Sequence, residues 1–89
     1  MTIQPDAELR DICRQIVAEG RSEAEWSAIE SDDWFQSANY VGGYDATEHA
    51  FCFSYLDSDR KEWWFQLSYE EAGRIAAGAV ASIELRNPA

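Results

Sequence analysis

The sequence has little of what most catalytic and metal-binding sites require. Its 89 residues include one histidine and two cysteines, Cys13 and Cys52, which have no CxxC spacing. The chain also contains no glycine-rich phosphate loop, nucleophile motif or zinc-ligand spacing. We therefore expect no enzymatic activity, no cofactor and no metal, and we interpret both cysteines as small buried hydrophobes. His49, next to Glu48, is expected to be an ordinary residue at the edge of a turn.

Positive charge is scarce. The 7 Lys and Arg residues are opposed by 17 Asp and Glu residues, which gives a formal net charge of −10. Nucleic acid and anionic membrane surfaces need a basic footprint, so we expect neither as a partner. An excess of carboxylates favours a basic protein as the partner. Within a dense acidic stretch, Glu23, Glu30, Asp32 and Asp33 are candidate interaction residues.

Long hydrophobic runs are absent as well. No segment approaches the roughly 18 consecutive apolar residues that indicate a membrane-spanning helix. The first residues, from Met1 to Asp6, lack the basic start and the apolar core of a signal peptide, so we expect a cytoplasmic protein. The chain contains no linker or internal repeat, and its length suits one hydrophobic core, which predicts a single domain over residues 1–89.

Aromatic residues are abundant, and they are densest between residues 50 and 67. Large apolar residues recur at every second position along 49–56 and 62–67, with a polar loop between the two segments. A period of two is typical of strands, so this stretch predicts a β-hairpin. Pairing Leu56 with Glu62 places the large apolar side chains on one face, and a shift by one residue would divide them. These side chains belong to Phe51, Phe53, Tyr55, Trp63, Phe65 and Leu67.

A further strand is expected over residues 39–45, before a turn that joins it to the hairpin. If Asp45 pairs with Glu48, then Gly42 lies opposite Phe51. A glycine in that position leaves room for the aromatic ring of its neighbour. The expected strands together make an antiparallel meander.

Helices are predicted where an apolar stripe follows an N-terminal cap. The stripe from Leu9 to Val17 follows Asp6, which is a suitable N-cap. Capping boxes that begin at Ser22 and Ser68 mark the starts of the other two helices. The predicted helices span residues of about 6–19, 22–30 and 69–81.

The element order ααβββα predicts an α+β fold, a three-stranded antiparallel β-meander with helices packed on it. Between the second helix and the first strand, Trp34 and Phe35 are expected to enter the core where helix gives way to sheet. Residues 82–85 alternate in polarity, and they fit either a last helical turn or a short extra strand.

The second face of the predicted sheet is unusually apolar for a surface in water. It contains Val41, Cys52, Leu56 and Trp64, which alternate with the residues assigned to the core. Either a helix covers this face, or the face is a contact surface for a partner or for a second copy of the chain. Val41, Leu56 and Trp64 are therefore candidate interaction residues.

The sequence supports three functional hypotheses. The leading one is a small acidic protein-interaction module without catalysis, in one version a neutraliser of a basic protein such as a nuclease toxin. The second is a homo-oligomeric structural protein, in its simplest form a homodimer, joined through the apolar second face. The third is a small-ligand binder or enzyme with a pocket beside the aromatic sheet.

Overall fold

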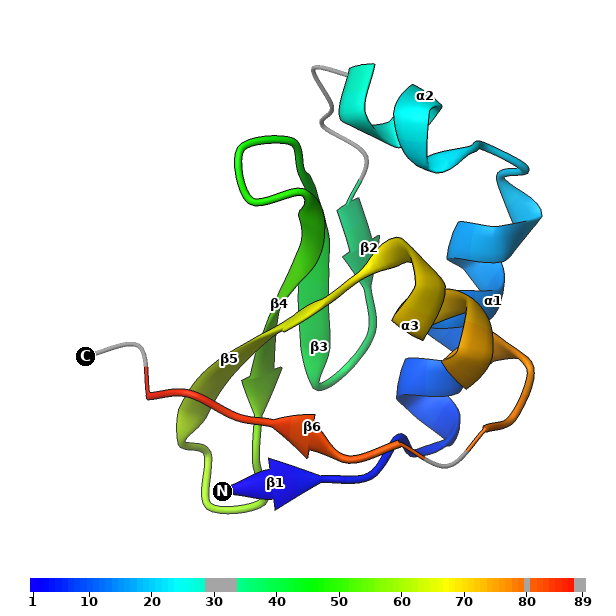
Figure 1. Cartoon of the computed structure of the whole chain (residues 1–89). Helices are drawn as coiled ribbons and strands as arrows, with labels where there is room; N and C mark the ends of the chain where they lie inside the picture. The colour runs from blue at the N-terminus through cyan, green and yellow to red at the C-terminus, as the bar shows by residue number, and fades with distance from the viewer. Residues whose placement is uncertain (29–33, 80, 88–89) are drawn as a thin grey trace.

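The computed structural model describes residues 1–28, 34–79 and 81–87, and it confirms the predicted α+β class (Figure 1). The elements are, in chain order, β1 (Thr2–Ile3), α1 (Ala7–Ala18), α2 (Glu23–Ala28), β2 (Trp34–Gln36), β3 (Tyr40–Asp45), β4 (Ala50–Leu56), β5 (Glu62–Leu67), α3 (Tyr69–Ala76) and β6 (Ile83–Glu84).

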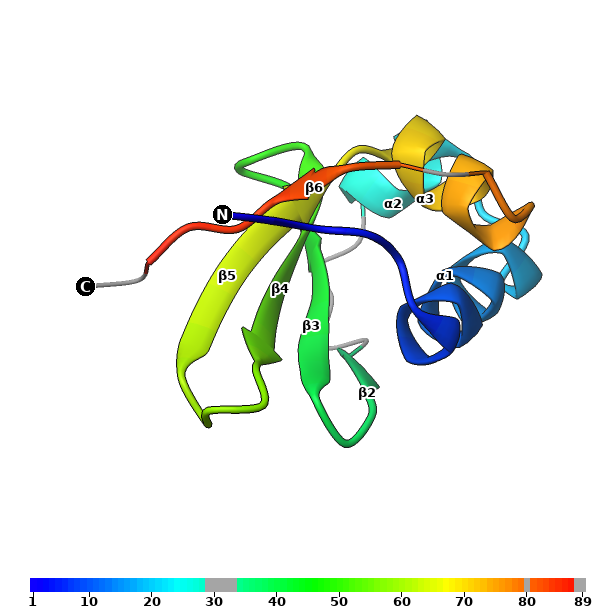
Figure 2. The same cartoon turned by 90° about the horizontal axis from the view of Figure 1, so that it is seen from below.

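The fold has a layer of helices and a layer of sheet. The larger sheet contains four antiparallel strands in the order β2-β3-β4-β5, and a smaller sheet pairs β1 with β6. Helices α1 and α3 lie together on one face of the larger sheet (Figures 1 and 2). Helix α2 lies near the end of the sheet that carries the β3–β4 turn (Figure 1). The other face of the larger sheet is not covered by any described helix (Figure 2).

The β4–β5 hairpin has the register predicted from its apolar pattern. Leu56 pairs with Glu62, and Phe53 pairs with Phe65. The rings of Phe53 and Phe65 are stacked with their centroids 5.4 Å apart, and both side chains are buried. One face of the hairpin therefore supplies a central part of the core.

The prediction of three strands is wrong, because a fourth strand, β2, pairs with β3. Phe35 in β2 lies opposite Gly42 and is buried, so it reaches the core from a strand rather than from a connecting segment. The side chain of Trp34 lies outside the part that the structure describes. A strand of 3 residues is too short to display a period of two, which is why its sequence does not indicate a strand.

The predicted register between β3 and β4 is wrong by two residues. Asp45 pairs with Ala50 rather than with Glu48, so Gly42 lies opposite Phe53. The wider turn is closed by the Asp45 carboxylate, which accepts a hydrogen bond from the backbone N–H of Glu48 at 3.3 Å. A shift of two residues leaves every side chain on its predicted face, and the glycine still lies opposite a phenylalanine.

The helices begin where their caps predict. Asp6 accepts a hydrogen bond from the N–H of Leu9 at 2.9 Å and caps α1. Ser22 and Glu25 exchange the two hydrogen bonds of a capping box before α2, at 3.2 and 3.3 Å. A second capping box begins α3. Helix α2 is described as far as Ala28, and the predicted end of this helix near residue 30 lies outside the described residues.

Helix α3 ends at Ala76, earlier than predicted. Gly78 adopts a left-handed conformation with a φ of 90°, and its N–H donates to the carbonyl of Ile75 at 3.0 Å. The N–H of Ala79 donates to the carbonyl of Arg74, also at 3.0 Å. These bonds form a Schellman motif, in which a glycine ends a helix. The apolar stripe continues past Gly78 and therefore hides this end in the sequence.

The segment 82–85, which fits either a helical turn or a strand, contains β6. β6 pairs with β1 in the antiparallel sense, so Thr2 lies opposite Glu84. The chain then continues along β5, where Arg86 forms an antiparallel bridge with Trp64. The C-terminal segment thus lies along the edge of β5 that faces away from β4 (Figures 1 and 2).

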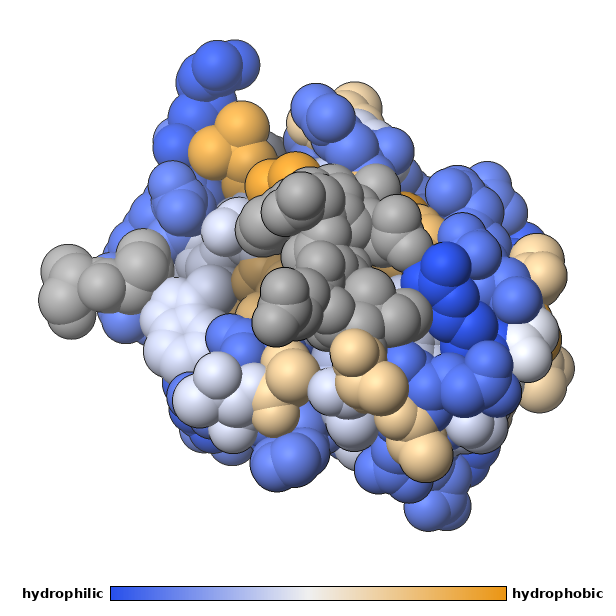
Figure 3. Space-filling model, turned by 90° about the horizontal axis from the view of Figure 1, so that it is seen from above, coloured by the Kyte–Doolittle hydropathy of each residue, from blue (hydrophilic) through white to orange (hydrophobic). Residues whose placement is uncertain are grey.

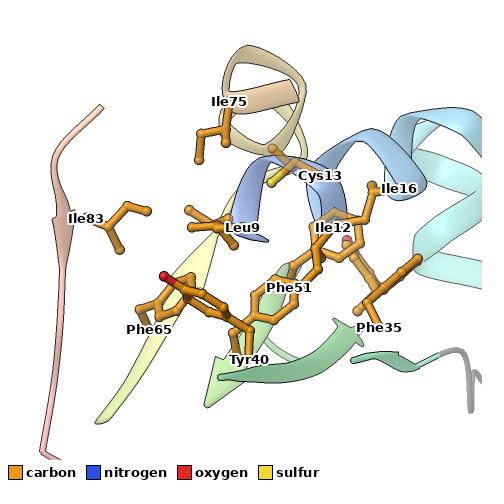
Figure 4. Close-up of a cluster of buried hydrophobic side chains, with 14 of the residues drawn as sticks. Leu9, Ile12, Cys13, Ile16, Phe35, Tyr40, Phe51, Phe65, Ile75 and Ile83 are labelled. Atoms are coloured by element: carbon orange, nitrogen blue, oxygen red, sulfur yellow. The ribbon is translucent and has the colours of Figure 1, made fainter. Parts of the chain in front are cut away.

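The core lies between the helices and one face of the larger sheet (Figure 4). From α1, Leu9 and Ile12 project toward the aromatic rings of the sheet, among them that of Phe51. Trp26 of α2 is fully buried, and its ring meets that of Phe51 edge to face at a centroid distance of 5.2 Å. Phe51, Phe53 and Phe65 of the hairpin are therefore structural.

The two cysteines are free and lie in different surroundings. Cys13 of α1 is buried as predicted, and burial raises the pKa of its thiol to about 12. Cys52 of β4 is only half-buried, so the prediction of a buried side chain is wrong for this residue. Cys52 belongs to the face of the sheet that α1 and α3 leave uncovered, which explains the difference.

Candidate functional site

The apolar residues predicted as an interaction surface lie on the face of the larger sheet turned away from α1 and α3. We call this face the open face and define it by Gln36, Val41, Cys52, Ser54, Leu56, Glu62, Trp64 and Gln66. Val41, Ser54 and Trp64 form one row across β3, β4 and β5. Val41 is 40% exposed, whereas Leu56 and Trp64 are half-buried. Val41 is therefore the most accessible of the predicted apolar residues.

Trp64 is partly covered by the chain itself. Its backbone N–H donates to the carbonyl of Arg86 at 2.9 Å, and its carbonyl accepts from the N–H of Arg86 at 2.8 Å. The guanidinium carbon of Arg86 lies 5.2 Å from the centroid of the Trp64 ring, which is a cation–π contact. The chain itself therefore explains the partial burial of Trp64. Val41 and Leu56, the other two predicted apolar residues, form the centre of the candidate site.

Near the β2–β3 turn, the open face contains a depression of about 310 Å³. We call it the Val41 depression. Its lining combines open-face residues with the turn at residues 37–39 and with Tyr40 and Tyr55, which alternate with the open-face residues along β3 and β4. The open-face residues that line it are Gln36, Val41, Ser54, Leu56 and Glu62. The depression thus brings two predicted residues together, and it adds an amide, a hydroxyl and a carboxylate to their apolar side chains.

The β2–β3 turn beside the depression is fixed to the start of α1. The Glu8 carboxylate accepts hydrogen bonds from the backbone N–H of Asn39 at 2.6 Å and from its side-chain amide at 3.0 Å. A hydrogen bond from Ser37, together with those from Asn39, holds the pKa of Glu8 below its usual value, although desolvation opposes this effect. Next to the turn, the Tyr40 hydroxyl donates to the Asp6 carboxylate at 3.2 Å. The wall of the depression is therefore held in place before any partner binds.

Carboxylates are present at both ends of the open face. Glu62 lies opposite Leu56 in the depression, is exposed, and forms no ion pair with the described residues. At the other end, burial raises the pKa of the Cys52 thiol, and the charges of Asp45 and Glu48 raise it further. Those two carboxylates are therefore close enough to act on Cys52. The apolar part of the open face lies between acidic groups.

The predicted acidic residues are not all on this surface. Glu23 is exposed in the first turn of α2, at the opposite end of the sheet from the β2–β3 turn (Figure 1). Glu30, Asp32 and Asp33 lie outside the described residues. Figure 3 views the molecule from the α2 end, where hydrophilic residues predominate and hydrophobic residues form small separate patches. Glu23 and the apolar pair Val41 and Leu56 therefore lie in different parts of the molecule, and a role for each of them in an interaction stays a prediction.

His49, Cys52 and the carboxylates are the titratable side chains with the chemistry of a metal or nucleophile site. Over residues 1–28, 34–79 and 81–87, no three His, Cys, Asp or Glu side chains are arranged to hold a metal ion. His49 is exposed in the β3–β4 turn and has a φ of 53°. The raised pKa of Cys52 disfavours the thiolate, which is the nucleophilic form of cysteine. Among the described helices, none is both long and apolar enough to cross a membrane.

Several residues of the site are missed by the sequence prediction. Gln36 lies on the short strand β2, whose sequence does not indicate a strand. Ser37 and Asn39 are typical turn residues, but their position against the open face depends on contacts with α1. Arg86 reaches Trp64 through a pairing between distant parts of the chain.

The fold defines an α+β protein whose four-stranded antiparallel sheet is covered by helices on one face. Comparison of the chain with protein-family models, curated proteins and solved structures finds no match.

Proposed function

We propose that the chain is a small cytoplasmic protein-interaction module without catalysis, which binds a basic protein through the open face of its sheet. The observation that carries the proposal is the Val41 depression, where an exposed apolar side chain lies beside the Glu62 carboxylate, which forms no ion pair within the described part of the chain. The formal net charge of −10 adds long-range attraction for a basic partner. Apolar side chains in a pocket anchor a complex, and surrounding charges steer the partner and select it.

Neutralisation of a basic toxin, such as a nuclease, is one version of this proposal. A nuclease needs a cationic surface to hold its polyanionic substrate. An acidic protein that covers such a surface would block substrate binding by charge and by bulk. The 17 acidic residues of this short chain suit that role.

A second candidate function is a homodimer joined through the open face. The exposure of Val41 and the half-burial of Leu56 favour it, because apolar residues on an open sheet face are a common basis for self-association. Two copies would bring together two chains of charge −10, with Glu62 within the contact. We therefore place the basic partner first.

Affinity capture tests the leading proposal. The wild-type chain and two variants, Val41→Asp and Val17→Asp, are immobilised and exposed to lysate of the source cell at low and high salt. Val17 is a suitable control because it is 53% exposed on α1, away from the open face, and its substitution changes the charge equally. We expect the wild type and Val17→Asp to retain the same basic protein at low salt and Val41→Asp to lose it.

The binding should weaken at high salt, because screening reduces the attraction between exposed charges. The proposal is contradicted if the wild type retains no basic protein at low salt. It is equally contradicted if all three proteins retain the same basic proteins in the same amounts, since the open face would then contribute nothing.

A further inference from the structure

We infer that the Val41 depression binds one arginine side chain of the basic partner, with its guanidinium at Glu62 and its aliphatic stem on Val41 and Leu56. This inference depends on the proposed function and specifies the chemistry of its partner. Three observations support it. They are the volume of the depression, the position of Glu62 next to the apolar residues that line it, and the absence of an ion pair at Glu62 within the described part of the chain.

The size of the depression suits a single side chain. Its volume of about 310 Å³ is at the lower end of the range of about 300–1,000 Å³ found for small-molecule sites. It is an open hollow of the sheet surface and is too small to receive a folded element. A long side chain that projects from a partner surface can enter it without rearrangement of the sheet.

The lining residues match the two parts of an arginine side chain. Val41 and Leu56 provide an apolar surface, and long basic side chains place their methylene stems on such surfaces while keeping the charge in water. Glu62 lies opposite Leu56 on the neighbouring strand, so its carboxylate is next to the apolar surface. Gln36 and Ser54 add a side-chain amide and a hydroxyl that can accept hydrogen bonds.

Arginine fits these groups better than lysine. A planar guanidinium has five N–H donors and binds a carboxylate through two parallel hydrogen bonds, whereas an ammonium is a compact point charge. The open face already holds one guanidinium, that of Arg86, at 5.2 Å from the centroid of the Trp64 ring.

A second copy of the chain fits the depression poorly as an occupant. Each copy has a net charge of −10, and pairing of two open faces would place the Glu62 carboxylates in a shared contact. Like charges at a contact cost energy and select against the wrong partner. Charge complementarity therefore favours a basic segment over self-association.

Amide NMR titration with acetylated and amidated tetra-arginine tests this inference, with tetra-lysine as the comparison peptide. The proteins are the wild type, Glu62→Gln and the matched control Glu23→Gln, which removes one exposed carboxylate from α2. We expect the largest shifts at Val41, Ser54 and Leu56. We also expect Glu62→Gln to weaken tetra-arginine binding about two- to fivefold, as for an exposed ion pair, and Glu23→Gln to leave it unchanged.

The inference is overturned if the shifts spread evenly over the acidic surfaces of the helices, or if Glu62→Gln and Glu23→Gln have equal effects. It is also overturned if tetra-lysine binds the wild type as tightly as tetra-arginine does. These results would not contradict the proposed function, in which the chain binds a basic protein through Val41. Failure of the capture experiment, with localised binding of tetra-arginine, would instead contradict the proposed function. The amide spectra themselves report whether each variant is folded.

Discussion

Gly42 and Gly73 show how differently one residue type is used in this chain. A Cβ atom on Gly42 would clash with the backbone carbonyl oxygen of Cys52, and it would lie 2.7 Å from Cδ1 of the Phe53 ring and 2.8 Å from the Cα of Phe53. A Cβ atom on Gly73, in α3, would meet no atom within 4 Å. Close packing across two strands therefore requires the first glycine. The second glycine only lowers the helix propensity of α3.

The substitutions Gly42→Ala and Gly73→Ala are expected to have opposite effects on stability. Gly42→Ala forces the ring of Phe53 or the neighbouring strand to move, so we expect the free energy of unfolding to fall by about 1–3 kcal/mol. Gly73→Ala adds a methyl group in open space within a helix, so we expect a gain of about 0.5–1 kcal/mol. Urea unfolding measures both changes, and an unaltered midpoint for Gly42→Ala would show that the sheet accommodates the methyl group.

The elements differ in how far their sequences predict them. The register of the β4–β5 hairpin is correct because its large apolar residues must share one face, which leaves one acceptable pairing. β2 is missed because its 3 residues are too few to show a period. The end of α3 is misplaced because the apolar stripe continues beyond Gly78, although a left-handed glycine ends the helix. Local pattern predicts long elements, whereas short ones depend on contacts that only the folded chain provides.

The C-terminal segment is the clearest element of that second kind. It adds a further pairing to the edge of β5, since both backbone groups of Trp64 bond to Arg86. Because backbone groups alternate in direction along a strand, the N–H groups of Trp63 and Phe65 point toward β4 instead. An unpaired strand edge exposes its N–H and C=O groups to water or to other chains. The segment therefore protects β5 at one position.

Truncation after Leu85 should expose the amide of Trp64 while leaving that of Phe65 protected. We expect hydrogen exchange at Trp64 to become faster in the truncated chain, because the carbonyl that accepts its N–H is lost. Arg86→Ala is the matched control, since it keeps the backbone bonds and removes only the guanidinium over the ring. Exchange followed by NMR measures both amides. Equal rates at Trp64 in the truncated and full-length chains would show that this pairing does not form in solution.

The molecule as a whole combines a compact fold with a strong net charge. Its radius of gyration is 12.3 Å, close to the value of about 12 Å expected for a compact chain of this length. The formal charge of −10 on so small a body produces a repulsive field between copies.

Composition alone predicts this charge, and strand alternation predicts that Val41 and Leu56 share a face. The depression between them could not be predicted, because it requires the β2–β3 turn to be held by α1.

The chain should therefore be a monomer, and sedimentation velocity at tens of micromolar protein measures this directly. At an ionic strength of about 0.01 M the Debye length is about 30 Å, so the repulsion between copies acts over their whole surfaces. At about 1 M the Debye length falls to about 3 Å, and only the apolar contact of the open face remains to join two copies. We expect a monomer under both conditions, because Val41 is 40% exposed whereas the apolar side chains of Leu56 and Trp64 are half-buried, which leaves little apolar surface to join two copies. A dimer that persists at low ionic strength and dissociates on Val41→Asp substitution would establish the homodimer and remove the open face as the site for a basic partner. Val17→Asp on α1 is the control again, and it should leave sedimentation unchanged in either case.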